Sequence, residues 1–168
     1  MISFVDDGLF VSQNKSILHS NVNLFCSYNI MSSLLSKFGL IIKHGKTDVF
    51  HFSRAHRAFN LPPLNLSSIG GPLLLPKDTW RYLGFIFDCK LTFRNHIDFY
   101  SNKAISTIKC MKLLGNSTKG INPLQKQQLY RCCVLPIVFY GFPLWYYNKA
   151  SMYYHLNILR KMQQRAAL

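Results

Sequence analysis

Two adjacent carboxylates near the start of the chain are the residues best suited to metal chemistry. Asp6 and Asp7 precede Gly8 and lie between two short apolar runs, residues 2–5 and 9–11. This pattern predicts a tight β-hairpin, with Gly8 supplying a positive φ near the turn. Two neighbouring carboxylates at a hairpin tip can share one side, where they repel unless cations or protons neutralise them. Oxygen ligands of this kind hold Mg²⁺ ions that clamp a phosphate during phosphoryl transfer.

The alternative interpretation of Asp6 and Asp7 is an ordinary turn, because Asp and Gly are standard turn residues. A second candidate for phosphate chemistry is Lys46, within residues 39–52, whose composition predicts a strand, a Gly-containing turn and a strand. Lys46 could reach a phosphate and donate a proton to departing pyrophosphate, or it could be a solvated turn lysine. Both interpretations stay open at each of these positions.

The charge of the chain is positive and unevenly distributed. The net charge is +14, from 20 Lys and Arg against six acidic residues, all of them Asp. Residues 1–98 hold ten basic residues and all six Asp, whereas residues 99–168 hold ten basic residues and no acid. Such a region favours a polyanionic partner, above all nucleic acid. A basic, solvated surface without a specific partner is the alternative.

Length and composition are typical of a globular protein. A chain of 168 residues with 49% hydrophobic residues can bury one core or two small subdomains. Its five cysteines include no Cys-x-x-Cys pair, which argues against a zinc site. Their odd number and the lack of a secretion signal predict an intracellular setting, the nucleus or the cytoplasm. The longest apolar run, residues 132–148, contains two prolines and is too short to span a membrane, so we expect it in the core.

The first half of the chain predicts a mixture of helix and short strands. A helix is expected from residue 16 to Gly39, which is placed to end it. Residues 55–79 predict a loop insert on the surface, with a strand near residues 73–75. Residues 80–87 predict one strand, which turns at residues 88–90. The core stripe expected on the helix comprises Leu18, Val22, Phe25, Leu35 and Phe38, and is widened by Tyr28, Met31 and Leu34.

Apolar residues recur at three and four positions from residue 94 onward, which predicts helices. In the first helix the stripe comprises Ile97, Tyr100, Ala104, Ile108, Met111 and Leu114. A second helix starts at Asn122 as N-cap with Pro123 at the first helical position. Its expected stripe comprises Leu124, Leu129, Cys132 and Leu135. An aromatic elbow at residues 140–145 precedes a last helix, whose stripe comprises Met152, Leu156, Leu159, Met162 and Ala166.

Four landmarks in a fixed order resemble reverse transcriptases of non-LTR (LINE-type) retrotransposons. Residues 4–7, Phe-Val-Asp-Asp, resemble motif C of the palm, and Gly39-Leu40 with Lys46-Thr47-Asp48 looks like motif D. Motif E, the primer-grip hairpin, is matched by Tyr82-Leu83-Gly84 with Asp88, Leu91, Phe93 and His96. Thumb sequences of the same elements are similar to Leu135-Pro136, Tyr140-Gly141, Trp145 and Gln163. The resemblance covers nearly the whole chain.

The resemblance implies an α+β fold and an RNA-directed DNA polymerase activity that uses Mg²⁺. Residues 1–93 would form a truncated palm of β-hairpin, helix and short strands, and residues 94–168 a mainly α-helical thumb. Asp6 would be a metal-binding carboxylate and Asp7 its neighbour in the site, and Lys46 would be the candidate proton donor to pyrophosphate. The primer-grip residues would be Tyr82, Leu83 and Gly84. Residues expected to hold the duplex backbone are Arg94, Lys103, Lys109, Lys112, Arg160, Lys161 and Arg165.

The implied partners are an RNA template and a DNA primer, or an RNA–DNA hybrid. No membrane partner is expected, and no small-molecule cofactor beyond the metal and deoxynucleotides. We expect the chain alone to be inactive, because the fingers and the palm strand with another metal-ligand Asp would precede Met1. One alternative is a non-enzymatic basic helical module that binds nucleic acid without sequence preference. Another is a helical interaction protein whose aromatic elbow docks a partner.

Overall fold

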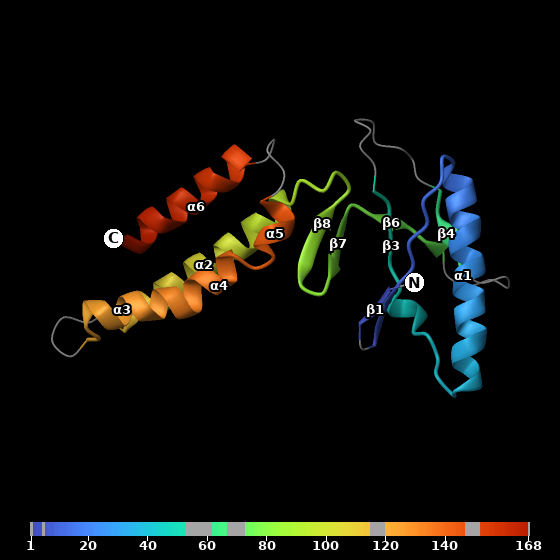
Figure 1. The fold of residues 1–168 in the computed structure, drawn as a ribbon, viewed down its shortest axis with the longest axis horizontal. Helices are drawn as coiled ribbons and strands as arrows, with labels where there is room; N and C mark the ends of the chain where they lie inside the picture. Colours follow the sequence, from blue (N-terminus) through green and yellow to red (C-terminus); the bar gives the residue numbers. More distant parts are fainter. Residues whose placement is uncertain are drawn as a thin grey trace. The chain divides into compact units, whose positions relative to one another are not determined.

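The structure of the protein is a computed structural model that describes residues 2–4, 6–52, 62–66, 73–114, 120–146 and 152–167. It divides the chain into two compact units (Figure 1). The first unit comprises residues 1–51 and 55–78, and the second comprises residues 52–54 and 79–168. Each unit is described by itself below.

The described residues of the first unit form one long helix and three small pairs of strands. Its hairpin pairs β1 (Ile2–Phe4) with β2 (Asp7–Leu9) in antiparallel register. Helix α1 (Ile17–Lys37) follows, and then a 3₁₀ turn, η1 (His44–Lys46). The remaining strands pair β3 (Val49–Phe50) in parallel with β6 (Pro76–Lys77), and β4 (Leu64–Asn65) antiparallel with β5 (Leu73–Leu74).

Helix α1 ends at Gly39, as its sequence predicts. Gly39 has φ +72°, a conformation that glycine adopts without strain. Its N–H donates to the carbonyl of Ser36 at 3.0 Å, and the N–H of Leu40 donates to the carbonyl of Leu35 at 3.0 Å. These two hydrogen bonds form a Schellman motif, which satisfies carbonyls that the end of a helix leaves unpaired.

The core of the first unit lies between α1 and the short strands. Tyr28, Leu64 and Leu66 are buried, and Leu24 of α1 packs beside them. The predicted helix stripe is therefore partly wrong, since its members Leu18, Val22 and Phe38 are exposed. The expectation that residues 55–79 lie on the surface is wrong for Leu64 and Leu66, which are buried beside α1, whereas the strand expected near residues 73–75 is present as β5.

Two local predictions in the first unit differ from the structure. Gly8 lies within β2, opposite Ser3, so Asp6 and not Gly8 lies in the hairpin turn. Residues 40–43 form no strand, although β3 follows as expected. Apolar composition predicted that first strand, but these residues come directly after the Schellman motif and have no strand partner among the described residues.

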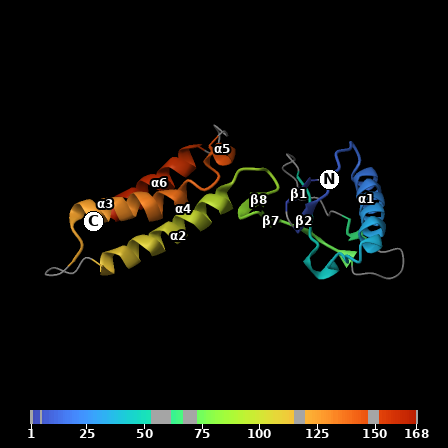
Figure 2. The ribbon, with the colours of Figure 1, turned by 60° about the horizontal axis from the view of Figure 1, so that its bottom comes forward.

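The second unit begins with a two-stranded hairpin and continues as helices. Strands β7 (Thr79–Tyr82) and β8 (Phe85–Asp88) pair antiparallel. The helices are α2 (Arg94–Leu113), α3 (Pro123–Leu129), a π-helical turn η2 (Tyr130–Val134), α4 (Leu135–Val138), α5 (Phe142–Trp145) and α6 (Met152–Ala167). Both α4 and α6 pack against α2 (Figures 1 and 2). The mixed helix and strand content confirms the α+β prediction.

The turn between β7 and β8 corrects the prediction of one continuous strand over residues 80–87. Leu83 and Gly84 have φ values of +47° and +82°, so both central residues of the turn are left-handed. Two-residue hairpin turns of this kind match the twist of the strands they join. The local sequence pattern does not reveal the turn, because Leu is an unusual residue at positive φ.

The helical core of the second unit follows α2. Ala104 and Ile108 of α2 are buried with Val134, Val138 and Met162. A second cluster contains Phe93, Ile97 and Trp145. The predicted stripe of α2 is confirmed through Ile108, and Asn122 and Pro123 start α3 with a capping box, as the sequence indicates.

The predicted stripe of the following helix is partly wrong, because η2 is a wide turn that changes the helical register. Leu124 is 68% exposed and Cys132 is exposed, whereas Val134 and Val138 are buried. A π turn places one more residue in the turn than an α-helix does. Residues before and after it therefore do not share the face that a regular helix would give them.

Among the described residues, no helix has an apolar stretch long enough to cross a membrane.

Candidate functional site

The carboxylate pair of the first unit lies at the tip of the β1–β2 hairpin. Asp6 is in the turn, and Asp7 begins β2 opposite Phe4. Both side chains are exposed to solvent. Their oxygens are the ligand type that Mg²⁺ prefers, so the donor set is chemically suitable. Within the described residues, however, no group of three or more His, Cys, Asp or Glu could hold a metal ion, so Asp6 and Asp7 have no further side-chain ligand of these types beside them.

Lys46 is the last residue of η1, and its side chain is exposed. The backbone of this turn is fixed locally, since the N–H of Lys46 donates to the carbonyl of Lys43 at 3.0 Å and Thr47 Oγ1 donates to the same carbonyl at 3.3 Å. Among the described residues, no hydrogen bond or ion pair joins Lys46 to Asp6 or Asp7.

Asp48, next to the Lys-Thr pair, forms an ion pair inside the first unit. Its carboxylate lies 2.6 Å from Lys77 Nζ, and the two side chains are 36% and 56% exposed. An exposed pair of this kind stabilises a fold by about 1 kcal/mol or less. It links the start of β3 to β6, two strands that are paired with each other.

The second candidate region is the turn between β7 and β8, which contains the predicted primer-grip residues Leu83 and Gly84. Its two carbonyl groups accept hydrogen bonds from tyrosine hydroxyls of the helical region. Tyr140 Oη donates to the carbonyl of Leu83 at 2.7 Å, and Tyr100 Oη donates to the carbonyl of Gly84 at 2.9 Å. The turn is therefore fixed to α2 and to the segment between α4 and α5.

His96 of α2 makes a further connection to the same hairpin. The N–H of Ile86 donates to His96 Nδ1 at 3.2 Å, and His96 Nε2 lies 3.1 Å from the carbonyl of Tyr140. Because a backbone N–H can only donate, Nδ1 carries no proton, and Nε2–H donates to the carbonyl. Burial lowers the pKa of His96, and the hydrogen bond to the Tyr140 backbone opposes this shift. The geometry and the burial both favour the uncharged imidazole.

Tyr82, the remaining predicted primer-grip residue, ends β7. Its ring stacks on Trp80 with centroids 5.0 Å apart, and Trp80 stacks on Phe87 at 5.4 Å. The Tyr82 hydroxyl is buried and has no hydrogen-bond partner among the described residues. The hairpin thus presents a row of aromatic rings along one side.

Asp88 joins the hairpin to α2. Its Oδ1 accepts from the N–H of Phe93 at 2.7 Å, and its Oδ2 accepts from the N–H of Thr92 at 2.9 Å and from Thr92 Oγ1 at 3.0 Å. Asp98, the other acid of the second unit, accepts from Tyr154 Oη of α6. Both acids of this unit are therefore engaged in internal hydrogen bonds.

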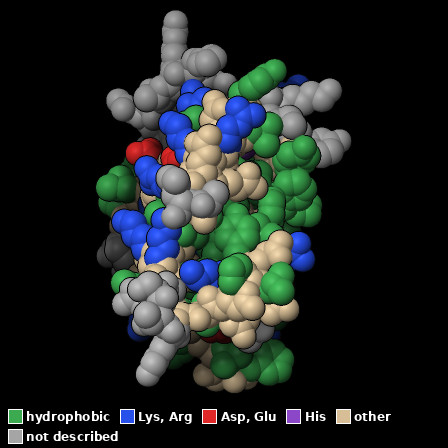
Figure 3. Space-filling view, turned by 90° about the vertical axis from the view of Figure 1, so that its left-hand side faces the viewer, with side chains coloured by type: hydrophobic (Ala, Val, Ile, Leu, Met, Phe, Trp, Pro, Cys, Tyr) green, Lys and Arg blue, Asp and Glu red, His purple; other side chains and the backbone are tan. Residues whose placement is uncertain are grey.

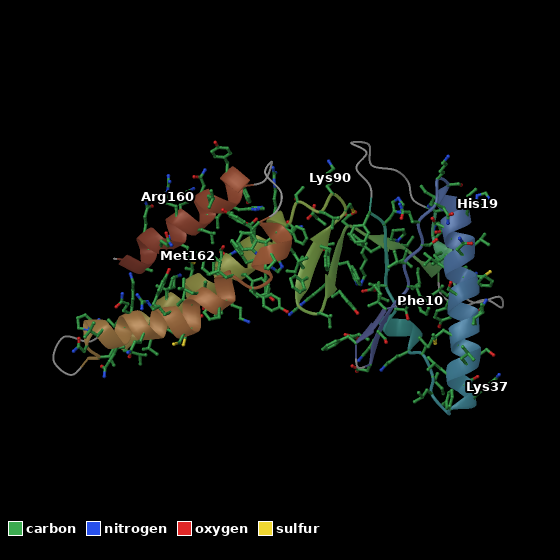
Figure 4. All side chains as sticks on the ribbon, in the orientation of Figure 1. Phe10, His19, Lys37, Lys90, Arg160 and Met162 are labelled. Carbon is green, nitrogen blue, oxygen red and sulfur yellow. The ribbon has the colours of Figure 1, made fainter. Side chains whose placement is uncertain are left out.

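The basic residues predicted to hold a duplex are all exposed on the second unit. They are Arg94, Lys103, Lys109 and Lys112 of α2, and Arg160, Lys161 and Arg165 of α6. Figure 3 shows Lys and Arg side chains at several places on the face turned to the viewer, most of them along one side. In Figure 4, Arg160 lies on the side of α6 away from α2, and the buried Met162 lies on the side that faces it.

Arg94 has a contact that its sequence position did not predict. Its guanidinium carbon lies 5.2 Å from the centroid of the Tyr154 ring. The same tyrosine donates to Asp98, and this hydrogen bond raises the pKa of Tyr154, with burial and the nearby carboxylate acting in the same direction. Arg94 is thus partly held against α6, whereas the other six basic residues form no cation–π contact or ion pair within the described part of the chain.

Sequence reasoning does not assign Tyr100, Tyr140 or His96 to any site. It places Tyr100 in the apolar stripe of α2 and Tyr140 in the aromatic elbow, and His96 enters only through the resemblance. One signal is present, because a buried tyrosine or histidine in an apolar stripe needs a partner for its polar atoms. The partners themselves are distant in the sequence, as with Tyr140 and Leu83, which are 57 residues apart.

Comparison with known proteins shows that the chain is similar to RNA-directed DNA polymerases of LINE-type mobile elements. The polymerase from mobile element jockey of Drosophila funebris is 27% identical over 163 residues, 97% of this chain. The jockey polymerase of Drosophila melanogaster is 24% identical over the same length, and the probable polymerase from transposon BS of that species is 28% identical over 86 residues, 51% of this chain. The resemblance predicted from the motifs is thereby confirmed.

The chain spans 17% of the length of each jockey polymerase and matches 10% of the transposon BS protein. No protein-family model matches the chain, and no solved structure does.

Proposed function

We propose that these residues are the part of a LINE-type RNA-directed DNA polymerase that carries a carboxylate pair of the active site and grips the primer–template duplex. The observation that carries the proposal is the second unit, in which an aromatic hairpin is fixed to helices with an exposed basic surface. The similarity along 97% of the chain supports it. The palm and thumb assignment, with its boundary at residue 93, belongs to this proposal.

In this proposal Asp6 and Asp7 would hold Mg²⁺ at the exposed tip of the β1–β2 hairpin. The metal, when bound, neutralises developing charge on the reacting phosphate and activates the attacking hydroxyl. Lys46, exposed and free of ion pairs among the described residues, would donate a proton to the departing pyrophosphate. Tyr82, Leu83 and Gly84 would place the primer end.

The basic residues would contact the phosphates of the duplex. Lys and Arg position a protein on nucleic acid through the backbone, and such contacts carry no sequence information. The second unit holds two acids, Asp88 and Asp98, against a larger number of Lys and Arg, and among the described residues neither acid forms an ion pair, so the surface keeps its positive charge. We therefore expect binding to an RNA–DNA hybrid that is indifferent to sequence and weakens steeply with salt.

We further propose that the purified 168-residue chain does not extend a primer. Two-metal catalysis needs ligands that hold both ions, and in the described residues no third ligand joins Asp6 and Asp7. In a reaction with primer, template, deoxynucleotides and Mg²⁺, we expect no incorporation above background. Incorporation that disappears in Asp6→Asn would contradict this and would show a complete site.

The second candidate function is a non-enzymatic module that binds nucleic acid without sequence preference. The same exposed basic surface favours it, and it requires no metal. Titration of the full chain with an RNA–DNA hybrid, with and without Mg²⁺ and at several salt concentrations, distinguishes the candidates. The polymerase proposal expects Mg²⁺ to change the affinity of the wild-type chain for the hybrid, but not the affinity of the Asp6→Asn, Asp7→Asn variant.

The binding surface itself is tested with two variants of equal charge. Lys109→Ala with Lys112→Ala removes two residues of the proposed surface, and Lys15→Ala with Lys37→Ala removes two exposed lysines of the first unit. Removing one Lys that binds a phosphate should reduce the log–log salt slope by about 0.9. If the two double variants have equal salt slopes, the basic residues of α2 do not contact the duplex, and that part of the proposal is wrong.

A further inference from the structure

Three side chains hold the tip of the β7–β8 hairpin, and we call them the tip clamp: His96, Tyr100 and Tyr140. The hydroxyls of Tyr140 and Tyr100 donate to the two carbonyls of the turn, at 2.7 Å and 2.9 Å. His96 accepts from the N–H of Ile86 in β8 and donates to the carbonyl of Tyr140. The clamp therefore contacts the turn, one strand and the segment before α5.

The clamp is also closely packed. Phe85, the first residue of β8, stacks on His96 at 5.6 Å with an interplanar angle of 12°, and on Tyr140 at 5.0 Å with an angle of 28°. Gly84 fits closely against the hydroxyls, since a Cβ built on it would lie 3.0 Å from Tyr140 Oη and 3.4 Å from Tyr100 Oη. The turn thus lies directly against the clamp.

A two-stranded hairpin is marginally stable by itself in water. In this unit, β7 and β8 pair only with each other among the described strands. Their position therefore depends on the contacts they make with the helices. The clamp supplies three hydrogen bonds to the hairpin, two of them at the turn where a hairpin is farthest from its own ladder.

We propose that His96, Tyr100 and Tyr140 are positioning residues that hold the Leu83–Gly84 turn at a fixed place relative to the basic helix α2, so that turn and helix engage one duplex together. This inference rests on the proposed function, because it assigns a role within the same duplex grip. The clamp acts through the turn and does not itself contact the reacting atoms.

The clamp requires His96 to be uncharged. A protonated Nδ1 could no longer accept from the N–H of Ile86, and the hairpin would lose that connection. The titratable groups in ring contact with His96 are Tyr100 of α2 and Tyr140, while β8 and the loop before α2 contribute Phe85 and Phe93. Among the described residues around the ring, no carboxylate stabilises the imidazolium.

The first test removes only the two hydroxyls, in the full chain carrying Tyr100→Phe and Tyr140→Phe. The matched control is Tyr153→Phe, which changes a tyrosine that is 84% exposed. Removing two hydrogen bonds should speed amide exchange in residues 81–87 by about tenfold or more, with residues 97–108 of α2 unchanged. Affinity for an RNA–DNA hybrid should fall, while the control behaves as wild type.

The second test uses His96. The N–H of Ile86 donates to His96, so the exchange rate of the Ile86 amide, corrected for its intrinsic rate, reports this hydrogen bond directly. We expect the Ile86 amide to exchange faster in His96→Phe. In His96→Asn the side-chain amide oxygen can accept from Ile86, so we expect part of the protection to return. In the wild-type chain the corrected exchange rate of Ile86 should rise from pH 7.5 to pH 5.5, and His96→Asn should not show this rise.

The outcomes separate the two levels of the inference. Unchanged exchange of residues 81–87 in the double tyrosine variant would overturn the clamp, whatever the binding result. Faster exchange with unchanged hybrid affinity would overturn the positioning role alone. Failure of the wild-type chain to bind the hybrid would overturn the proposed function and the positioning role with it.

Discussion

Gly141 is the residue whose substitution should most clearly test the packing of the second unit. It has φ +68°, and a Cβ built on it would lie 2.0 Å from Cε1 of Phe85 and 2.9 Å from its Cζ. Left-handed backbone costs a non-glycine residue about 1–2 kcal/mol. Carbon atoms normally approach to about 3.5–4.0 Å, so the ring would have to move by about 1.5 Å or more.

Phe85 cannot move freely, because it stacks on both His96 and Tyr140. Forcing a methyl group into a packed site costs about 1–3 kcal/mol. The two effects together predict that Gly141→Ala lowers the free energy of unfolding of the second unit by about 2–5 kcal/mol. Because Gly141 directly follows Tyr140 in the chain, the change should also loosen the hairpin turn that Tyr140 holds.

Urea unfolding monitored by tryptophan fluorescence measures this effect, since Trp80 and Trp145 are the two tryptophans of the chain and both lie in the second unit. With a slope of about 1 kcal/mol per molar urea, the midpoint should fall by about 2 M or more. Gly39→Ala is the matched control, at φ +72° with nothing within 4 Å of its added Cβ. Gly39→Ala should lower the free energy of unfolding of the first unit by about 1 kcal/mol, which the circular dichroism of α1 would follow.

A second substitution shows whether the ring is the cause. In the Phe85→Ala background the added methyl group has space, so Gly141→Ala should then cost about 1–2 kcal/mol, the backbone contribution alone. A midpoint shift below about 0.5 M in the single variant, or the same cost in both backgrounds, would refute the argument from the Phe85 contact.

Three further predictions concern the stability of the second unit. Asp88→Ala should lower the free energy of unfolding by about 2 kcal/mol, since it removes the acceptor for Thr92 and Phe93, and urea denaturation would show no change if those hydrogen bonds contribute nothing. Met162→Ala should lower the free energy of unfolding by about 3 kcal/mol, because it opens a cavity in the α2–α4–α6 core. Leu156→Ala, at a 43% exposed position of the same helix, should lower the melting temperature clearly less in the same thermal melt. Burial lowers the pKa of His96 and of His155, so below about pH 6.5 the unfolded chain binds more protons than the folded one. The free energy of unfolding should therefore be largest above that pH and decline as the pH falls. Denaturation midpoints that rise on acidification from pH 7 to pH 5.5 would contradict this sign.

The helices are the part of the fold that the sequence predicts well, because their signals are local. Asn122 with Pro123 starts α3, and Gly39 ends α1, as backbone chemistry at helix ends requires. The stripe of α2 is found because its buried residues follow a regular helical spacing. The shifted stripe around η2 is not found, because periodicity assumes a constant number of residues per turn.

The candidate site is predictable only in part. Sequence places Asp6 and Asp7 on a hairpin, which the structure has, and finds the exposed basic residues from their spacing on helices. It cannot find the tip clamp, because the hydrogen bonds of the clamp join residues that are far apart in the sequence, with separations of 16, 44 and 57 positions. Contacts at such separations leave no periodic pattern in the sequence. The catalytic and binding roles of these residues stay predictions until the experiments above are done.

The wide turn η2 also has a consequence for variation in chain length. None of the described residues of α3 is buried, whereas Val134 and Val138, at and beyond the end of η2, are anchored in the core. Deleting one of the exposed residues Cys132 or Cys133 would let the turn close to α-helical geometry, and because the turn holds one extra residue, α3 would keep its orientation relative to α4. Tyr130 is the packed residue that would have to adjust. This position can therefore gain or lose a residue while the helices beyond it keep their packing, which makes it a natural place for an insertion or deletion between related chains.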